Sequence, residues 1–93
     1  MVVGVLRLKL MIPGAHSLKD KRRALRGLKD RLRAQHNVSV AEVDAHDVWQ
    51  TAVLGVAAVG VDRASAEGAL DRAAALARMS SQVVLARAEK DFV

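Results

Sequence analysis

Apolar and polar residues alternate along residues 2–12, and the alternation is strict in the second half of this segment. One set of positions there is entirely aliphatic: Leu6, Leu8, Leu10 and Ile12. Arg7, Lys9 and Met11 fall between them. A period of two residues predicts a β-strand with one buried face, and Pro13-Gly14 is expected to end it.

The pattern changes to a helical period after the proline. Ser17 is expected to cap the N-terminus of a helix, with Asp20 three residues later as a short form of the capping box. At about 100° per residue, four leucines share a narrow stripe that should face the core: Leu18, Leu25, Leu28 and Leu32. Lys21 falls on the same stripe, and we expect its methylenes to cover apolar surface while its ammonium reaches water.

Two more strands are predicted over residues 36–47 and 48–60, and the second is apolar at almost every position. Because only residues 44–47 connect them, these strands should pair as an antiparallel hairpin. A second helix is predicted over residues 62–80, and a last strand over residues 81–92 turns polar at its end.

The predicted order of elements is therefore β-α-β-β-α-β, with Asp62 as the cap of the second helix. A right-handed crossover in each half places both helices on one face of a four-stranded antiparallel sheet. This arrangement is a ferredoxin-like sandwich of the α+β class. Residues 1–93 contain no internal linker or repeat, so we expect a single domain.

The other face of such a sheet is left uncovered, and the strand at 48–60 is largely apolar on both sides. A strand that is apolar on both faces is normally buried on both. We therefore expect a homodimer in which a second copy covers part of the open face or an edge, with Trp49 and Val53 as anchors of the core or of the dimer. The alternative is that small residues such as Thr51 and Ala57 tolerate water.

Composition excludes several classes of site. The chain has no cysteine, so it has no disulfide framework, no thiolate nucleophile and no cysteine metal ligand. The first residues lack the basic start of a signal peptide, and their apolar run is interrupted by Arg7 and Lys9. We expect a cytoplasmic protein without membrane contact, and no cofactor is predicted.

Positive charge is concentrated in the first predicted helix. Eight of the fifteen Lys and Arg residues lie between Lys19 and Arg33, against two Asp, whereas the rest of the chain is nearly neutral. On a helix, six of them occupy one arc, called here the basic face: Lys19, Arg22, Arg23, Arg26, Lys29 and Arg33. A local basic face is typical of proteins that bind an anionic partner, most commonly a nucleic acid. The alternative is a solvated face that keeps a small protein soluble.

The basic face begins where the helix dipole is already positive, which disfavours Lys19, Arg22 and Arg23 in an isolated helix. A phosphate bound at this end would reverse that effect, because helix N-termini bind anions. His16, just before the helix, could contact the same phosphate. Its alternative role is structural, packing against the first strand or assisting the cap.

Three short stretches in this order and spacing resemble the YlxP-like family of small uncharacterised bacterial proteins. They are His16-Ser17-Leu18-Lys19 with Lys21-Arg22, Ser39-Val40-Ala41-Glu42-Val43, and Asp47-Val48-Trp49-Gln50. The resemblance covers residues 4–61 and implies a ferredoxin-like fold, no established activity, and genes that neighbour translation and ribosome-maturation genes in many bacteria. This context points to RNA of the ribosome or of its precursors as the partner, and no DNA is expected. Ala45 departs from the polar residue expected there.

Other functions have weaker support in the residues. The cluster Glu42, Asp44, His46 and Asp47 could offer metal ligands, but hairpin loops are polar for ordinary reasons, and we predict no metal. Acylphosphatases share the order of elements, yet the loop "IPGAHS" lacks their arginine, so we predict no enzyme activity. The alternative to RNA binding is a structural or regulatory homodimer that binds a protein or a small anionic ligand.

Overall fold

The computed structural model describes all residues from Met1 to Val93 and confirms the predicted order of elements. It has four strands and two helices: β1 (Val2–Met11), α1 (Leu18–Gln35), β2 (Ser39–Asp44), β3 (Thr51–Gly60), α2 (Arg63–Met79) and β4 (Val84–Phe92). The strands form one antiparallel sheet in the order β2-β3-β1-β4. The fold is therefore the predicted ferredoxin-like α+β sandwich.

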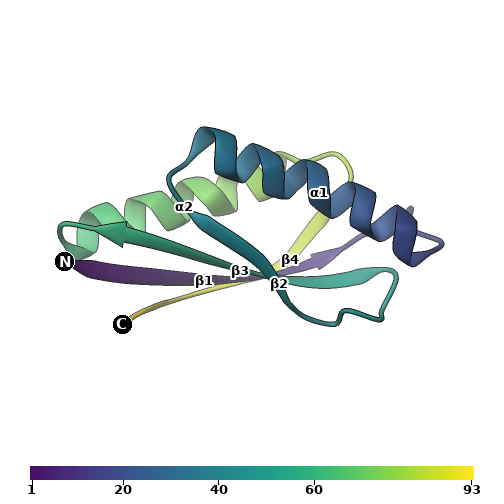
Figure 1. Cartoon of the computed structure of the whole chain (residues 1–93), viewed down its shortest axis with the longest axis horizontal. Helices are drawn as coiled ribbons and strands as arrows, with labels where there is room; N and C mark the ends of the chain where they lie inside the picture. The colour runs from purple at the N-terminus through teal and green to yellow at the C-terminus, as the bar shows by residue number, and fades with distance from the viewer.

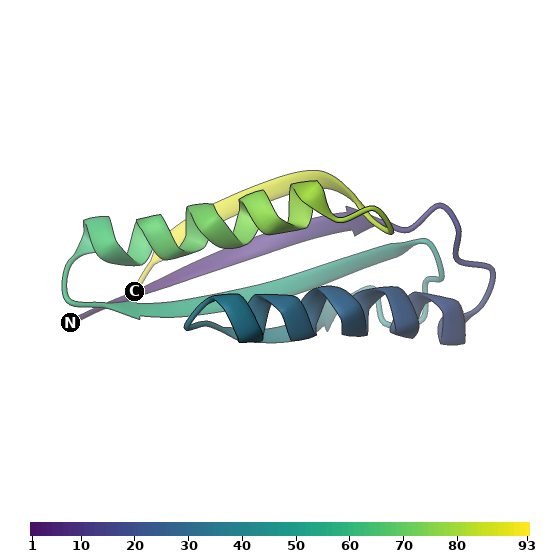
Figure 2. The ribbon, with the colours of Figure 1, turned by 90° about the horizontal axis from the view of Figure 1, so that it is seen from above.

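Both helices cover the same face of the sheet and lie side by side along it (Figures 1 and 2). α1 runs over the β2 side of the sheet, whereas α2 lies over β1, β3 and β4. The opposite face of the sheet has no element of the chain upon it (Figure 1). The molecule is a layer of helices on a layer of strands.

The core lies between these layers and follows from the alternation along β1. Leu6 and Leu8 stand opposite Val56 and Leu54 of β3, and all four are buried. Three leucines of the α1 stripe pack onto them from above: Leu25, Leu28 and Leu32. Each fully buried leucine contributes about 2 kcal/mol of hydrophobic free energy.

The helix starts agree with the predicted caps. The Ser17 hydroxyl accepts a hydrogen bond from the Asp20 backbone N–H at 3.0 Å, while the Asp20 carboxylate accepts one from the His16 N–H rather than from Ser17. At the start of α2, Asp62 and Ser65 bond reciprocally in a capping box. The hydrogen bonds from Ser65 hold the pKa of Asp62 below its ordinary value.

The second strand is shorter than predicted. β2 spans only Ser39–Asp44, because His36 still donates its N–H to Leu32 and belongs to the end of α1. At the other end the register with β3 shifts between Glu42 and Asp44, and Ala45 then takes a left-handed φ of 60°. This backbone turn starts the connection to β3, which leaves the predicted strand positions after Asp44 in a loop.

The prediction for Lys21 is wrong. Its side chain is 1% exposed, and its ammonium is buried beneath α1 instead of reaching water. The ammonium lies 2.8 Å from a carboxylate oxygen of Glu42 and donates a hydrogen bond of 2.6 Å to the Ala45 carbonyl. These partners offset the cost of burying a charge.

Candidate nucleic-acid interface

The basic face lies on the side of α1 that turns away from the core towards the β2 edge of the sheet. Five of its side chains are exposed, and Lys29 is half-buried. The face covers Lys19 to Arg33, which corresponds to roughly 20 Å along a helix. It owes its position to the leucine stripe, because burying that stripe against the sheet fixes the rotation of α1 and turns the cations outward.

Most of the cations on this face have no acidic partner within the chain. Lys19, Arg22, Arg23, Arg26 and Lys29 make no ion pair and no side-chain hydrogen bond. The acids nearest in sequence are engaged elsewhere: Asp20 caps the loop before the helix, and Asp30 lies 3.9 Å from Arg33. The positive field of the basic face is therefore left largely uncompensated.

Arg33 differs from the other members of the basic face. It donates a hydrogen bond of 2.7 Å to the Val40 carbonyl, so it fixes the end of α1 to β2. Its side chain is still half exposed, and its charge still belongs to the surface. Arg31, which is outside the basic face, donates to the Ser80 hydroxyl at 2.9 Å and links α1 to the end of α2.

Four cations of the basic face line a groove between α1 and β2: Arg22, Arg26, Lys29 and Arg33. Their spacing of four, three and four residues places them in one row along the helix. The groove has a volume of about 490 Å³, and two acids form part of its wall, Asp30 of α1 and Glu42 of β2. An anion in this groove would meet charges from about three helical turns at once.

The buried pair of Lys21 and Glu42 sets the geometry of the groove. Lys21 fixes the first turn of α1 to the Glu42 side chain and to the Ala45 carbonyl of the following loop. The contact with Glu42 is an ion pair without hydrogen-bond alignment, and the same carboxylate oxygen is buried without another partner. Because Lys21 compensates Glu42, the one acid on the β2 wall does not cancel the cations that face the groove.

Comparison with known proteins places this chain in a family. The family described as "Protein of unknown function (DUF503)" matches residues 3–90. The chain belongs to the DUF503 family. It is 35% identical over 71 residues to the "Uncharacterized protein YlxP" of Bacillus subtilis (strain 168), which covers 76% of this chain and 77% of that protein. The resemblance inferred from the sequence is thereby confirmed.

A solved structure is also similar. It is a C-terminal segment of the alpha subunit of aIF2 from Pyrococcus abyssi, with 17% identity and a TM-score of 0.49. All of this chain is matched, but it spans about half the length of that segment, 49%.

His16 of this DUF503 protein is exposed in the loop before α1. Its backbone N–H donates to Asp20, whereas its ring makes no hydrogen bond. The ring therefore lies free at the N-terminal end of the basic face. Its contact with phosphate stays a prediction.

The two expected anchors lie in different surroundings. Trp49 is 52% exposed in the loop before β3, so its assignment to the core is wrong and its role in a dimer stays a prediction. Val53 is 7% exposed, but it lies outside the core cluster, on the open side of the sheet among Lys9, Asp44 and Arg87. The neighbouring Gln50 has a clear structural role, because its amide donates to the Pro13 and Ala15 carbonyls.

The polar residues of the β2–β3 connection do not converge on one point. Glu42 pairs with Lys21, Asp44 pairs with Arg7 at 3.2 Å, and the His46 ring lies 3.2 Å from the Glu42 carbonyl. No group of three or more His, Asp or Glu side chains in the chain is arranged to hold a metal ion. Neither helix combines the length and the apolar character needed to cross a bilayer.

Proposed function

We propose that this DUF503 protein binds RNA through the basic face of α1, by contacts to the phosphate backbone. The observation that supports the proposal most is the set of five unpaired cations from Lys19 to Lys29, over about three turns of the helix, with the groove beside it. Lys and Arg that neutralise phosphates release counterions, which favours binding with little dependence on sequence.

The position of the cations at the start of α1 adds to this support. Lys19 stands in the first turn, where the helix dipole is positive, so it lowers the stability of the free helix, and Arg22 and Arg23 follow in the second turn. A bound phosphate near His16 would be attracted both by these side chains and by the helix N-terminus. An arrangement that is unfavourable in the free protein becomes favourable in the complex.

The scarcity of aromatic residues limits the kinds of RNA that the protein can recognise. Phe92 already lies under the Arg63 guanidinium at 4.4 Å, which leaves Trp49 as the only other aromatic side chain. A sheet that reads unpaired bases needs several such rings. We therefore propose that the protein recognises the shape and backbone of folded RNA. The gene context implied by the YlxP-like resemblance favours ribosomal or pre-ribosomal RNA in the cytoplasm, with a binding role and no catalysis.

A small anionic ligand is the second candidate, and the convergence of four cations on one groove favours it. A volume of about 490 Å³ lined by Arg22, Arg26, Lys29 and Arg33 is sufficient for a molecule with one or two phosphate groups. Such a ligand would leave Lys19 and Arg23 unused, because neither lines the groove. A long RNA would use both.

The proposal is tested by reversing charge on one helix and comparing it with the other. Arg22→Glu/Arg26→Glu changes two exposed cations of α1, and Arg72→Glu/Arg78→Glu changes two exposed, unpaired cations of α2. Both variants lower the net charge equally. We expect the α1 variant to weaken binding to a structured ribosomal RNA fragment by about a hundredfold, and the α2 variant by less than about threefold.

Equal effects of the two variants would contradict the proposal, because binding would then follow net charge and not the basic face. Inorganic pyrophosphate that displaces the RNA at one molecule per protein chain would support the small ligand, provided that this displacement is lost when Arg26 is changed and kept when Lys19 is changed. If the protein does not bind RNA even at low salt, the basic face is a solvated surface without a role in RNA binding.

A further inference from the structure

The face of the sheet opposite the helices, called here the open face, carries the residues that alternate with the core positions. Along β1 these are Val3, Val5, Arg7, Lys9 and Met11, and along β3 the opposing residues are Val59, Ala57, Gly55, Val53 and Thr51. The two strands differ most in side-chain size at the middle, where Val5 and Arg7 stand opposite Ala57 and Gly55. We call Val5 and Arg7 the ridge, and the lower surface over Ala57 and Gly55 the furrow.

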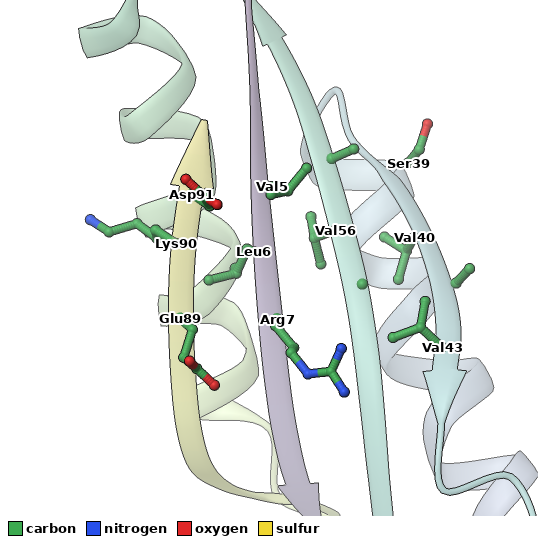
Figure 3. Close-up of a pocket in the computed structure, with 13 residues that line it drawn as sticks. Val5, Leu6, Arg7, Ser39, Val40, Val43, Val56, Glu89, Lys90 and Asp91 are labelled. Atoms are coloured by element: carbon green, nitrogen blue, oxygen red, sulfur yellow. The ribbon is translucent and has the colours of Figure 1, made fainter. Parts of the chain in front are cut away.

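The furrow is a measurable hollow. The hollow has a volume of about 670 Å³ and runs from Val43 on β2, over Gly55 and Ala57, past Val5 and Arg7 to charged residues of β4 (Figure 3). The β4 residues that line it are Glu89, Lys90 and Asp91. The open face and its margins also expose apolar side chains that have no cover in one copy: Met11, Val43, Val59 and Val84. These side chains lie at both ends of the sheet, and a second layer over the open face would cover all of them.

We propose that a second copy of this chain covers the open face, in a two-fold sandwich whose axis runs parallel to the strands between β1 and β3. This operation places β1 of one copy over β3 of the other. Val5 then lies over Ala57 of the partner, and Arg7 over Gly55, so the ridge of each copy fills the furrow of the other. Each β1 then runs antiparallel to the β3 that it faces, and the strand axes of the two sheets are nearly aligned, as in aligned sheet packing.

The same operation brings one pair of opposite charges together, Arg87 and Asp44, although each also has a partner within its own copy: Glu89 for Arg87, and Arg7 for Asp44. In the sheet register, Arg87 on β4 and Asp44 on β2 belong to one row, which crosses Lys9 and Val53. The two-fold axis exchanges β4 with β2, so Arg87 faces Asp44 of the partner on both sides of the dimer. In a symmetric interface this contact occurs twice.

Pairing through an edge of the sheet is less favourable than pairing through the open face. The exposed edge of β4 carries a run of three charged residues, Glu89, Lys90 and Asp91, with Arg87 two positions before them. The edge of β2 is only six residues long, and its register is irregular near Glu42. Short, charged or bulged edges oppose strand addition.

The size of the open face suits a stable dimer. Strands of ten, ten, nine and six residues cover roughly 550 Å² per copy, or about 1,100 Å² in total, at ordinary strand spacings. This area is at the lower limit of the range for stable protein interfaces. The fit of the ridge into the furrow and the Arg87–Asp44 contacts supply the complementarity of the proposed interface.

The test is a charge-swap cycle measured by sedimentation equilibrium on nuclease-treated protein. The wild type should have twice the chain mass of 10.0 kDa at micromolar concentration. Arg87→Glu and Asp44→Lys should each raise the dissociation constant by about tenfold or more, and the double variant should restore it to within about threefold. Arg78→Glu, which reverses an exposed cation on α2, serves as the control and should have no effect.

Arg87 and Asp44 are separated by two strands and roughly 14 Å within one sheet, so direct rescue between these two positions is expected across copies. Arg7 and Glu89, their partners within one copy, are unchanged in every variant. A protein that stays monomeric at all concentrations would overturn the proposal and leave the open face to another partner. A dimer that responds to neither single variant would overturn the two-fold arrangement. Circular dichroism of each variant establishes that it is folded.

Discussion

At the scale of single residues, Lys21 decides how α1 is attached to the rest of the molecule. Among the fifteen Lys and Arg residues it alone is buried, and its ammonium joins Glu42 of β2 to the Ala45 carbonyl of the following loop. The neighbouring cations of the basic face depend on this attachment for their position beside the groove. A buried pair of this kind adds little net stability, but it is costly to break.

Replacement of Lys21 should therefore be far more damaging than its charge alone suggests. Lys21→Met keeps the apolar stem but leaves the Glu42 carboxylate and the Ala45 carbonyl without their partner. We expect the free energy of unfolding in urea to fall by about 3 kcal/mol, with most of the loss recovered in Lys21→Met/Glu42→Met. A loss below about 1 kcal/mol in the single variant would mean that water replaces the ammonium.

Ala45 is the only non-glycine residue with a positive φ, at 60°. An L-residue with a Cβ is strained in this region, and glycine is not. Ala45→Gly should therefore raise the free energy of unfolding by about 0.5–1 kcal/mol in urea denaturation. Ala41→Gly, at an exposed strand position, is the control and should lower it by a similar amount. Destabilisation by Ala45→Gly would show that loop entropy outweighs backbone strain.

At the scale of elements, local patterns were sufficient to predict the fold. The alternation along β1, the leucine stripe of α1 and the serine and aspartate caps each depend on residues close in sequence. The position of the basic face followed from the same leucine stripe. These features could be predicted because helix and strand periods determine which side of an element is buried.

The features that sequence reasoning missed depend on pairs that are distant in the chain. Lys21 and Glu42 are 21 positions apart, and nothing in the period of either element shows that they meet. One indication was available, since Lys21 falls on the core side of its helix and Glu42 shares the parity of the buried Val40. The exposure of Trp49 was not predicted because β3 begins only at Thr51, and no local pattern shows that Trp49 lies outside the strand.

A substitution at the start of α1 that stabilises the protein should at the same time weaken its binding to RNA. Lys19 lies in the first turn, so Lys19→Glu removes a charge that the helix dipole disfavours and should raise the free energy of unfolding by about 0.5 kcal/mol. The same change should weaken RNA binding. Lys29→Glu, in the middle of the helix, is the control for lost repulsion among the cations and should stabilise less. A larger gain from Lys29→Glu would contradict the dipole argument.

At the scale of the whole molecule, the charge and the apolar surface are separated. The helical layer carries the basic face, while the opposite layer carries the furrow of the open face (Figures 1 and 3). A dimer formed through the open faces would leave both basic faces on its outer layers. Two linked copies of a weak phosphate-binding face would bind a large RNA more tightly than one.

The most direct test of the central claim is the affinity for a structured ribosomal RNA fragment, measured by fluorescence anisotropy from 50 mM to 300 mM salt. Five unpaired cations predict that the logarithm of the affinity falls linearly with the logarithm of the salt concentration, with a slope of roughly −3 to −5. Arg22→Glu/Arg26→Glu should make this slope shallower by about two, whereas Arg72→Glu/Arg78→Glu should leave it unchanged. A slope near zero, or one that the α1 variant does not alter, would contradict phosphate binding by the basic face.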